Sequence, residues 1–189
     1  MEKITNKYQH LKRFNVSRET YYLLEYYQKL LLGKNKEINL ISRKDVDNLF
    51  ERHILDCAQI IDFIDLNKKT CTDLGSGAGL PGIVLSILLK GKNIKLKMNL
   101  YEKSHLKSNF LRSVVQELKL DANIFEKNVF FEKNLISGSI VARAFKPLPI
   151  ILELVEKNFN NYSNLIVLMG KNGKQLLEDS IKNWEFEYK

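Results

Sequence analysis

The sequence has only two cysteines, three prolines and three histidines among its 189 residues, and these shortages exclude several kinds of protein. Two cysteines cannot make the disulfide framework of a small secreted domain, and their spacing matches no zinc site. We therefore expect Cys57 and Cys71 to be small buried residues, and we expect no bound metal. No apolar run approaches the roughly 20 residues of a membrane span, and the first residues lack the apolar core of a signal peptide. These absences predict a cytoplasmic protein that does not associate with membranes.

The composition is that of one folded domain with a basic surface. Hydrophobic residues make up 44% of the chain, which is enough for a full core at this length. The net charge of +8 favours a polyanionic partner such as RNA, because lysine and arginine side chains neutralise phosphates. A lysine-rich composition can also produce this charge without any nucleic-acid function. The charge alone therefore does not decide between the two interpretations.

Periodicity along the chain predicts an α/β fold. Two helical patterns come first, at residues 17–32 and 45–64, with Ser17 and Asp45 as candidate N-caps. Apolar strands then alternate with helices, which is typical of a mainly parallel sheet covered on both faces. We expect strands near 69–74, 95–102, 122–128, 138–143 and 163–169, helices near 80–90, 105–119, 149–159 and 172–182, and a last extended segment at 184–188. These elements divide into a helical extension at residues 1–66 and a core at residues 67–189.

The segment Asp73–Gly82 carries the strongest functional signal. Gly75, Gly77 and Gly79 separate a strand from a helix, so the backbone can turn sharply and approach a ligand. The pattern differs from the dinucleotide motif Gly-x-Gly-x-x-Gly because the third glycine comes one residue early and Asp73 precedes the first. An acidic entrance of this kind suits a cationic cofactor without a pyrophosphate, such as S-adenosylmethionine. Asp73 can also cap the turn by accepting backbone N–H groups.

Two further cofactor positions follow neighbouring strands. Glu102 ends the second strand, where an acidic side chain can accept hydrogen bonds from ribose hydroxyls; a surface glutamate is the alternative. Val129 and Phe130 follow the third strand, where an apolar side chain can lie against an adenine ring. Core packing of Phe130 and Phe131 is at least as consistent with the sequence.

Arg143 and His53 are the candidate catalytic residues. Arg143 ends an apolar strand, where a guanidinium group needs a partner or a cleft, and the alternative is a structural ion pair. His53 lies three residues before Asp56 on the second predicted helix, although a histidine there is more often packed or exposed. Three basic residues after the second strand can face phosphates or water: Lys103, Lys107 and Arg112.

These residues together give the chain a resemblance to a known family. It resembles the RsmG family, also called GidB, of 16S rRNA guanine-N7 methyltransferases. The glycine turn alone indicates a methyltransferase, and the segment Arg52–Asp56 ahead of it makes the resemblance specific. The matching segments run in family order at 39–42, 52–56, 73–82, 110–112, 117–120 and 143–145.

The resemblance implies a class I S-adenosylmethionine-dependent methyltransferase fold with an N-terminal helical extension. The acceptor would be N7 of a guanine in a 16S rRNA loop near the decoding site, in the 30S subunit or an assembly intermediate, and the protein would be a monomer. Carried over by position, Gly75 and Leu80 would line the cofactor and Glu102 would bind its ribose. Val129 and Phe130 would lie at its adenine. Arg143 would lie beside the methyl-transfer centre. His53 would also be functional, but the resemblance does not specify its role.

The chain departs from the family pattern at three places. Met169 stands where the family often has lysine, so the function of that positive charge is either taken over by Lys171 or lost. Glu102 replaces an aspartate found in many members. One extended segment follows the last helix where the fold usually has two strands, so the last strand is either missing from the protein or cut from this sequence.

The chemistry of N7 limits the mechanism. Its lone pair carries no proton, so it can attack a sulfonium methyl without a general base, and catalysis would depend on positioning and desolvation. The base must be unpaired or flipped, because the major groove of duplex RNA is too narrow. The alternatives are a methyltransferase of the same fold acting on a small molecule or protein, a nicotinamide-dependent oxidoreductase, and a non-enzymatic RNA-binding module.

Overall fold

A five-stranded parallel sheet forms the centre of the protein. The computed structural model describes residues 8–180, 182, 184 and 187–188. The strand order is β3-β2-β1-β5-β7, and all four neighbouring pairs are parallel. The strands are β1 (Thr70–Leu74), β2 (Lys97–Tyr101), β3 (Ala122–Phe125), β5 (Ser139–Arg143) and β7 (Asn164–Leu168). The predicted α/β class with a mainly parallel sheet is confirmed.

Both faces of this sheet are covered, because successive side chains of a strand point to opposite sides. Val141 belongs to one hydrophobic cluster, whereas its neighbours Ile140 and Ala142 belong to a second cluster on the other face. The same alternation separates Leu100 from Tyr101 at the end of β2. The apolar strands in the sequence are therefore apolar on two sides, as expected for a parallel sheet between helices.

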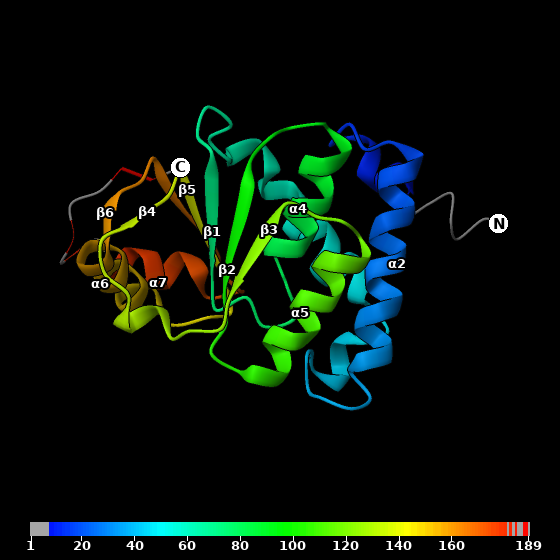
Figure 1. Ribbon diagram of the computed structural model, residues 1–189. Coiled ribbons are helices and arrows are strands. Elements are labelled where there is room, and N and C mark those ends of the chain that lie inside the picture. Colours follow the sequence, from blue (N-terminus) through cyan, green and yellow to red (C-terminus); the bar gives the residue numbers. More distant parts are fainter. Residues whose placement is uncertain (1–7, 181, 183, 185–186, 189) are drawn as a thin grey trace.

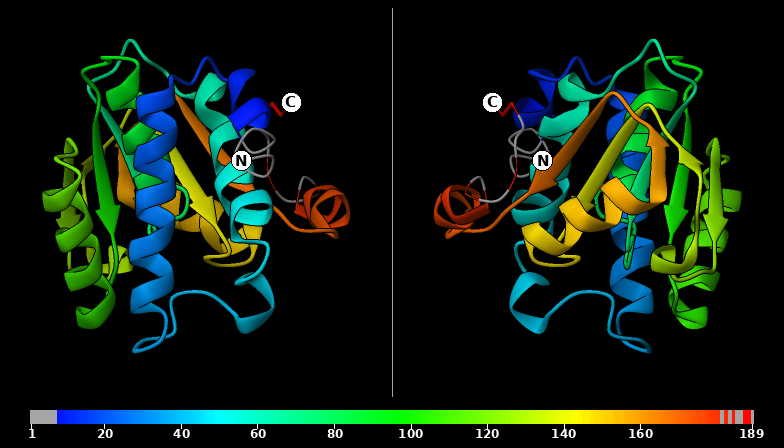
Figure 2. Two further views of the ribbon diagram at one scale, coloured as in Figure 1. Left: turned by 90° about the vertical axis from the view of Figure 1, so that its right-hand side faces the viewer. Right: turned by 90° about the vertical axis from the view of Figure 1, so that its left-hand side faces the viewer.

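Helices α4 (Gly82–Gly91) and α5 (His105–Glu117) lie on one side of the sheet, and α6 (Leu148–Asn158) lies on the other (Figure 1). Helix α2 (Arg18–Lys34) contacts α4 and α5 and is the outermost layer on its side (Figure 2). Helix α7 (Gly173–Ser180) contacts α6. The described part of residues 1–66 shares one hydrophobic cluster with α4 and α5. The division at residues 66 and 67 stays a prediction, since packing continues across it.

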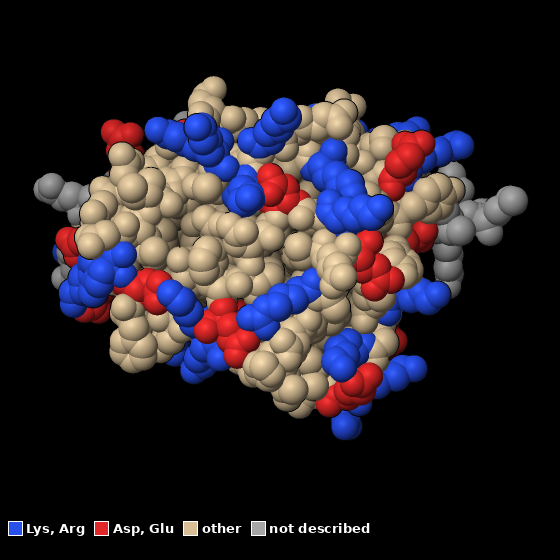
Figure 3. All heavy atoms as spheres, viewed as in Figure 1, with Lys and Arg blue, Asp and Glu red and all other residues tan. Residues whose placement is uncertain are grey.

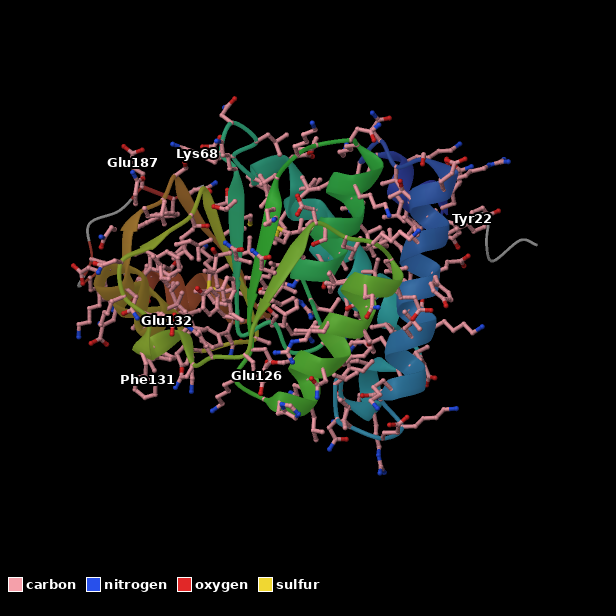
Figure 4. The ribbon with its side chains drawn as sticks, viewed as in Figure 1. Tyr22, Lys68, Glu126, Phe131, Glu132 and Glu187 are labelled. Atoms are coloured by element: carbon pink, nitrogen blue, oxygen red, sulfur yellow. The ribbon has the colours of Figure 1, made fainter. Side chains whose placement is uncertain are left out.

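Helix α2 begins where its sequence predicts. The Ser17 hydroxyl accepts a hydrogen bond from the backbone N–H of Thr20 at 3.2 Å. One face of the helix is buried through Tyr21, Leu24, Tyr27 and Leu31, which follow the helical spacing of three and four residues. Tyr22 is 60% exposed and points away from this face (Figure 4).

The helix predicted at residues 45–64 is confirmed in part: residues 49–63 are helical without a gap, but the helix begins later than predicted and its hydrogen-bond pattern is irregular. The segment contains 3₁₀ turns at Arg43–Asp45 (η1) and Gln59–Phe63 (η3), a wide π-type turn at Phe50–Leu55 (η2) and a short α-helical piece, α3 (Asp56–Ala58). Asp45 is not an N-cap, because η1 begins after Ser42. Leu49, Phe50 and Ile54 of the segment's apolar stripe are nevertheless buried, as an amphipathic helix requires.

Two further differences lie near the carboxyl half. A small parallel sheet pairs β4 (Leu135–Ile136) with β6 (Phe159–Asn161), neither of which the sequence predicted. The extended segment predicted at 184–188 includes residues 185–186, which lie outside the described residues, and the described 184, 187 and 188 belong to no strand. Cys57 and Cys71 are both buried, as predicted. No helix among the described residues is long and apolar enough for a membrane span.

Candidate functional site

A cavity of about 420 Å³ opens at the carboxyl ends of β1, β2 and β5. The chain leaves β1 toward β2 on one side, whereas β5 pairs with β1 on the other, so the strand order reverses at this point. In parallel α/β sheets this crevice is where ligands bind. Its lining comes from the turns that follow the strands and, separately, from residues 40–53 of the N-terminal segment.

The three glycines of the turn after β1 have different roles. All three have positive φ angles: +67° at Gly75, +57° at Gly77 and +95° at Gly79. Gly75 and Gly77 line the cavity, and a Cβ added at Gly77 would have no atom nearer than 3.8 Å. A Cβ at Gly79 would instead lie 2.4 Å from Cγ1 of Ile83. Gly79 therefore permits close packing of the turn on α4 and does not line the cavity.

Glu102 lines the cavity and also holds the turn. Its Oε2 accepts the backbone N–H of Gly77 at 2.9 Å, and its Oε1 accepts that of Ser104 at 2.7 Å. The side chain is 8% exposed. Each carboxylate oxygen can accept a second hydrogen bond, so the group can serve the turn and a ligand at once.

Asp73 lies beneath the turn and not at the cavity entrance. It is 1% exposed, and its Oδ2 accepts the backbone N–H of Gly82 at 3.0 Å, at the start of α4. Oδ1 is buried without a hydrogen-bond partner among the described residues. Burial is the main reason that the pKa of this carboxyl rises from 3.8 to about 7. Of the two roles considered for Asp73, these contacts agree with the one in which its carboxylate accepts a backbone N–H group next to the turn.

This pKa predicts how stability depends on pH. Between about pH 4 and 7, the folded protein keeps Asp73 protonated whereas the unfolded chain ionises it, so stability falls as pH rises. The slope is about 1.4 kcal/mol per pH unit for one group. We expect Asp73→Asn to remove this contribution. The free energy of unfolding of the variant minus that of the wild type should therefore be about 2–4 kcal/mol larger at pH 7.5 than at pH 4.5. Urea unfolding at both pH values measures this difference, and Asp62→Asn, at an exposed residue, is the control. A constant difference would contradict the prediction.

Val129 and Phe130, which were predicted together to lie at the adenine, have different surroundings in the structure. Val129 is buried and lines the cavity at the start of the 3₁₀ turn η4 (Val129–Phe131), whereas Phe130 does not line it. The Phe130 ring packs against Phe145, with 5.9 Å between ring centroids. Phe131 is 81% exposed and lies at the surface (Figure 4). Asn158 holds η4 by donating to the backbone oxygens of Val129 at 2.9 Å and Phe130 at 3.2 Å.

Arg143 and His53 both line the cavity, although 90 residues separate them in the chain. Nη2 of Arg143 donates to the backbone oxygen of Arg52 at 3.2 Å. No carboxylate among the described residues forms an ion pair with Arg143, so the expected alternative, a structural ion pair, is not seen. Burial, assisted by the charge of Arg143, lowers the pKa of His53 below 6.5, which leaves its ring neutral at pH 7.

Sequence reasoning missed part of the lining. Asp45, Tyr101 and Phe145 line the cavity. The place of Tyr101 at a strand end and of Phe145 in a family segment could have indicated them, whereas no sequence signal indicated Asp45. Lys103 and Lys107 also line it, whereas Arg112 pairs with Glu126 at 2.7 Å, away from the cavity. Lys and Arg side chains are scattered among Asp and Glu side chains on the face seen in Figure 3. The described residues bring no three potential metal ligands together.

A parallel sheet of this order, with a glycine turn after β1 and an acidic residue ending β2, belongs to the class I S-adenosylmethionine-dependent methyltransferases. A SAM-dependent O-methyltransferase from Thermotoga maritima has a similar fold, with a TM-score of 0.50 at 15% identity, covering 84% of this chain and 60% of that one. This likeness concerns the fold alone.

The sequence comparisons narrow the class to one family. The family described as "GidB: rRNA small subunit methyltransferase G" matches residues 20–189. The ribosomal RNA small subunit methyltransferase G of Pelagibacter ubique (strain HTCC1062) is 51% identical over 190 residues, covering 100% of this chain and 89% of its own length. The protein with the same name from Bartonella tribocorum is 35% identical, covering 92% of this chain and 81% of its own length. The chain belongs to the GidB family of methyltransferases.

Proposed function

We propose that the protein transfers the methyl group of S-adenosylmethionine to N7 of a guanine in the 16S rRNA loop near the decoding site. The observation that carries this proposal is the 51% identity over the full chain with a ribosomal RNA small subunit methyltransferase G. The family segments 39–42 and 52–56 also contribute cavity residues, so the resemblance extends to the site itself. The nicotinamide and RNA-binding alternatives do not agree with membership of this family.

The cavity residues fit the proposed cofactor. Gly77 leaves an open surface where any side chain would occupy the cavity. Glu102 keeps a free lone pair on each oxygen for ribose hydroxyls, and Val129 offers a buried apolar surface for an adenine ring. Asp73, Gly79 and Phe130 would act indirectly, by supporting the turn and η4. When bound, S-adenosylmethionine supplies an electrophilic methyl group on a sulfonium.

The chain's own residues would act by holding the base and excluding water. The N7 lone pair would accept the methyl group that the bound cofactor supplies, and sulfur would keep the electron pair of its former bond. No proton leaves N7, so a general base is not needed. The free N–H groups of Arg143 are suited to guanine O6, an acceptor next to N7. We propose a monomeric enzyme acting in the cytoplasm on the 30S subunit or an assembly intermediate.

Mapping of N7-methylguanine in 16S rRNA tests this function. RNA from cells that contain the protein should carry the modification in the loop near the decoding site, and RNA from cells without the gene should lack it. Purified protein with S-adenosylmethionine should restore it on subunits from the second strain. If those subunits stay unmodified while a small molecule or protein accepts the methyl group, the alternative methyltransferase is correct.

A further inference from the structure

Part of the cavity wall comes from outside the sheet. Residues 40–53 contribute Leu40, Ile41, Ser42, Asp45 and His53, whereas the proposed cofactor positions all follow strands of the core. The base to be methylated must meet the cofactor in this cavity. The N-terminal segment is therefore, together with Arg143, a part of the wall that is available to recognise the base.

Asp45 carries the only carboxylate in this N-terminal part of the lining. Its Oδ2 accepts a hydrogen bond from the Ser42 hydroxyl at 2.6 Å, and this bond lowers the pKa of Asp45. Nη1 of Arg52 lies 3.7 Å from Oδ1. The side chain remains 24% exposed. A carboxylate with free lone pairs thus faces the cavity, whose other carboxylate, that of Glu102, accepts backbone N–H groups of the glycine turn and of Ser104.

His53 gives a second and independent indication. It is 8% exposed and lines the same cavity, yet neither ring nitrogen has a hydrogen-bond partner among the described residues. Its Nε2 stands 3.6 Å from Oδ2 of Asp45, which is too long for a hydrogen bond. Buried polar atoms without partners are costly, and contacts of this kind often shorten when a ligand binds. Asp45 and His53 therefore have hydrogen-bonding capacity that a bound ligand could use.

Guanine matches this carboxylate better than any other base. Its Watson–Crick edge places two donors, N1–H and the N2 amino group, side by side, and a carboxylate offers two acceptors. Adenine has an acceptor at N1 and no amino group at C2, so it would leave Asp45 facing a lone pair. We propose that Asp45 reads the N1–H and N2 amino group of the target guanine and that His53 positions its carboxylate, an inference that rests on the proposed function.

The same contact assists the reaction. Methylation at N7 places a positive charge on a base that was neutral in the ground state. A carboxylate at N1–H stabilises that charge more strongly as it develops, and an interaction of this kind lowers the barrier. Arg143 at O6 would hold the base but would withdraw electrons from it. Asp45 offsets this withdrawal.

Inosine provides a sharp test, because it keeps N7, O6 and N1–H and lacks only the N2 amino group. Small subunits are reconstituted with 16S rRNA ligated to carry guanosine or inosine at the methylated position. Wild-type protein should prefer guanosine by about tenfold to a hundredfold in kcat/KM, the range for a hydrogen bond to a charged group. Asp45→Asn should bring this ratio near one, and the exposed Asp47→Asn should keep the wild-type ratio. His53→Gln should reduce the ratio while Asp45 is intact.

The outcomes separate the two proposals. If wild-type protein methylates neither subunit, the proposed function fails. If it methylates the guanosine subunit and Asp45→Asn keeps the wild-type ratio, only the role of Asp45 fails, and its bond with Ser42 is a local contact within the N-terminal segment. Thermal unfolding of each variant shows whether a lost ratio reflects loss of the fold.

Discussion

We expect Arg143→Ala to lower kcat/KM for methylation of small subunits by about a hundredfold to a thousandfold and to leave S-adenosylmethionine binding nearly unchanged. The physical reason is loss of positioning, since misplacing a reacting base costs rates of this order. Arg143 lies at the end of β5 in the cavity, with one hydrogen bond to the backbone of Arg52 and no carboxylate partner among the described residues. Its remaining donors are therefore available to the base.

Two further variants make this result interpretable. Arg143→Lys keeps the charge and loses the planar fork of donors, so we expect an intermediate rate. Arg18→Ala removes an exposed arginine at the start of α2, far from the cavity lining, and should match wild type. Single-turnover rates measure the chemical step, and calorimetry measures cofactor binding. Full activity of Arg143→Ala would show that another group holds the base.

Gly79→Ala destabilises the protein by about 3–5 kcal/mol, the combined range for a strained backbone and an overpacked core. The φ angle of +95° disfavours any residue with a Cβ, and the new Cβ would lie 2.4 Å from Cγ1 of Ile83 and 3.0 Å from Cδ2 of Leu111. Both neighbours are fully buried, so they cannot move aside cheaply.

Gly33→Ala is the matched control for this substitution. Gly33 lies inside α2, and a Cβ there would meet no atom within 4 Å. Alanine should therefore stabilise the helix by about 0.5–1 kcal/mol. Urea unfolding of both variants measures the two free energies. Equal effects at residues 33 and 79 would mean that the turn after β1 has no special conformational demand.

The sheet and much of the site could be predicted because their signals are local. The strands of the main sheet alternate along the chain with helical patterns, and a parallel sheet brings the carboxyl ends of its strands to one edge. Gly75, Glu102 and Arg143 therefore meet in one cavity although they follow three different strands. The position of a residue after a strand was enough to place it near the ligand.

The other features of the site could not be predicted, because they depend on contacts between residues that are distant in the sequence or on the detailed path of a turn. Asp73 and Gly75 differ by two positions, yet Asp73 is buried at the end of β1 and Gly75, the first residue of the turn, lines the cavity. Phe130 packs against Phe145 and does not itself line the cavity. The helix predicted at 45–64 begins only at residue 49, and the turn at residues 46–48 ahead of it leaves Asp45 near His53. Periodicity alone could not show that juxtaposition.

One long-range contact has a consequence for how the protein is made. The hydroxyl of Tyr27 in α2 donates to the backbone oxygen of Ala78 at 2.8 Å, and the buried face of α2 packs on α4, at residues 82–91. A ribosome adds about 5–20 residues per second, so α2 leaves the peptidyl-transferase centre several seconds before these partners are synthesised. During that interval the nascent chain exposes a stripe of tyrosine and leucine with no native surface to cover it. Chaperone binding or aggregation at this stage would compete with formation of the glycine turn, long before any methyl group is transferred.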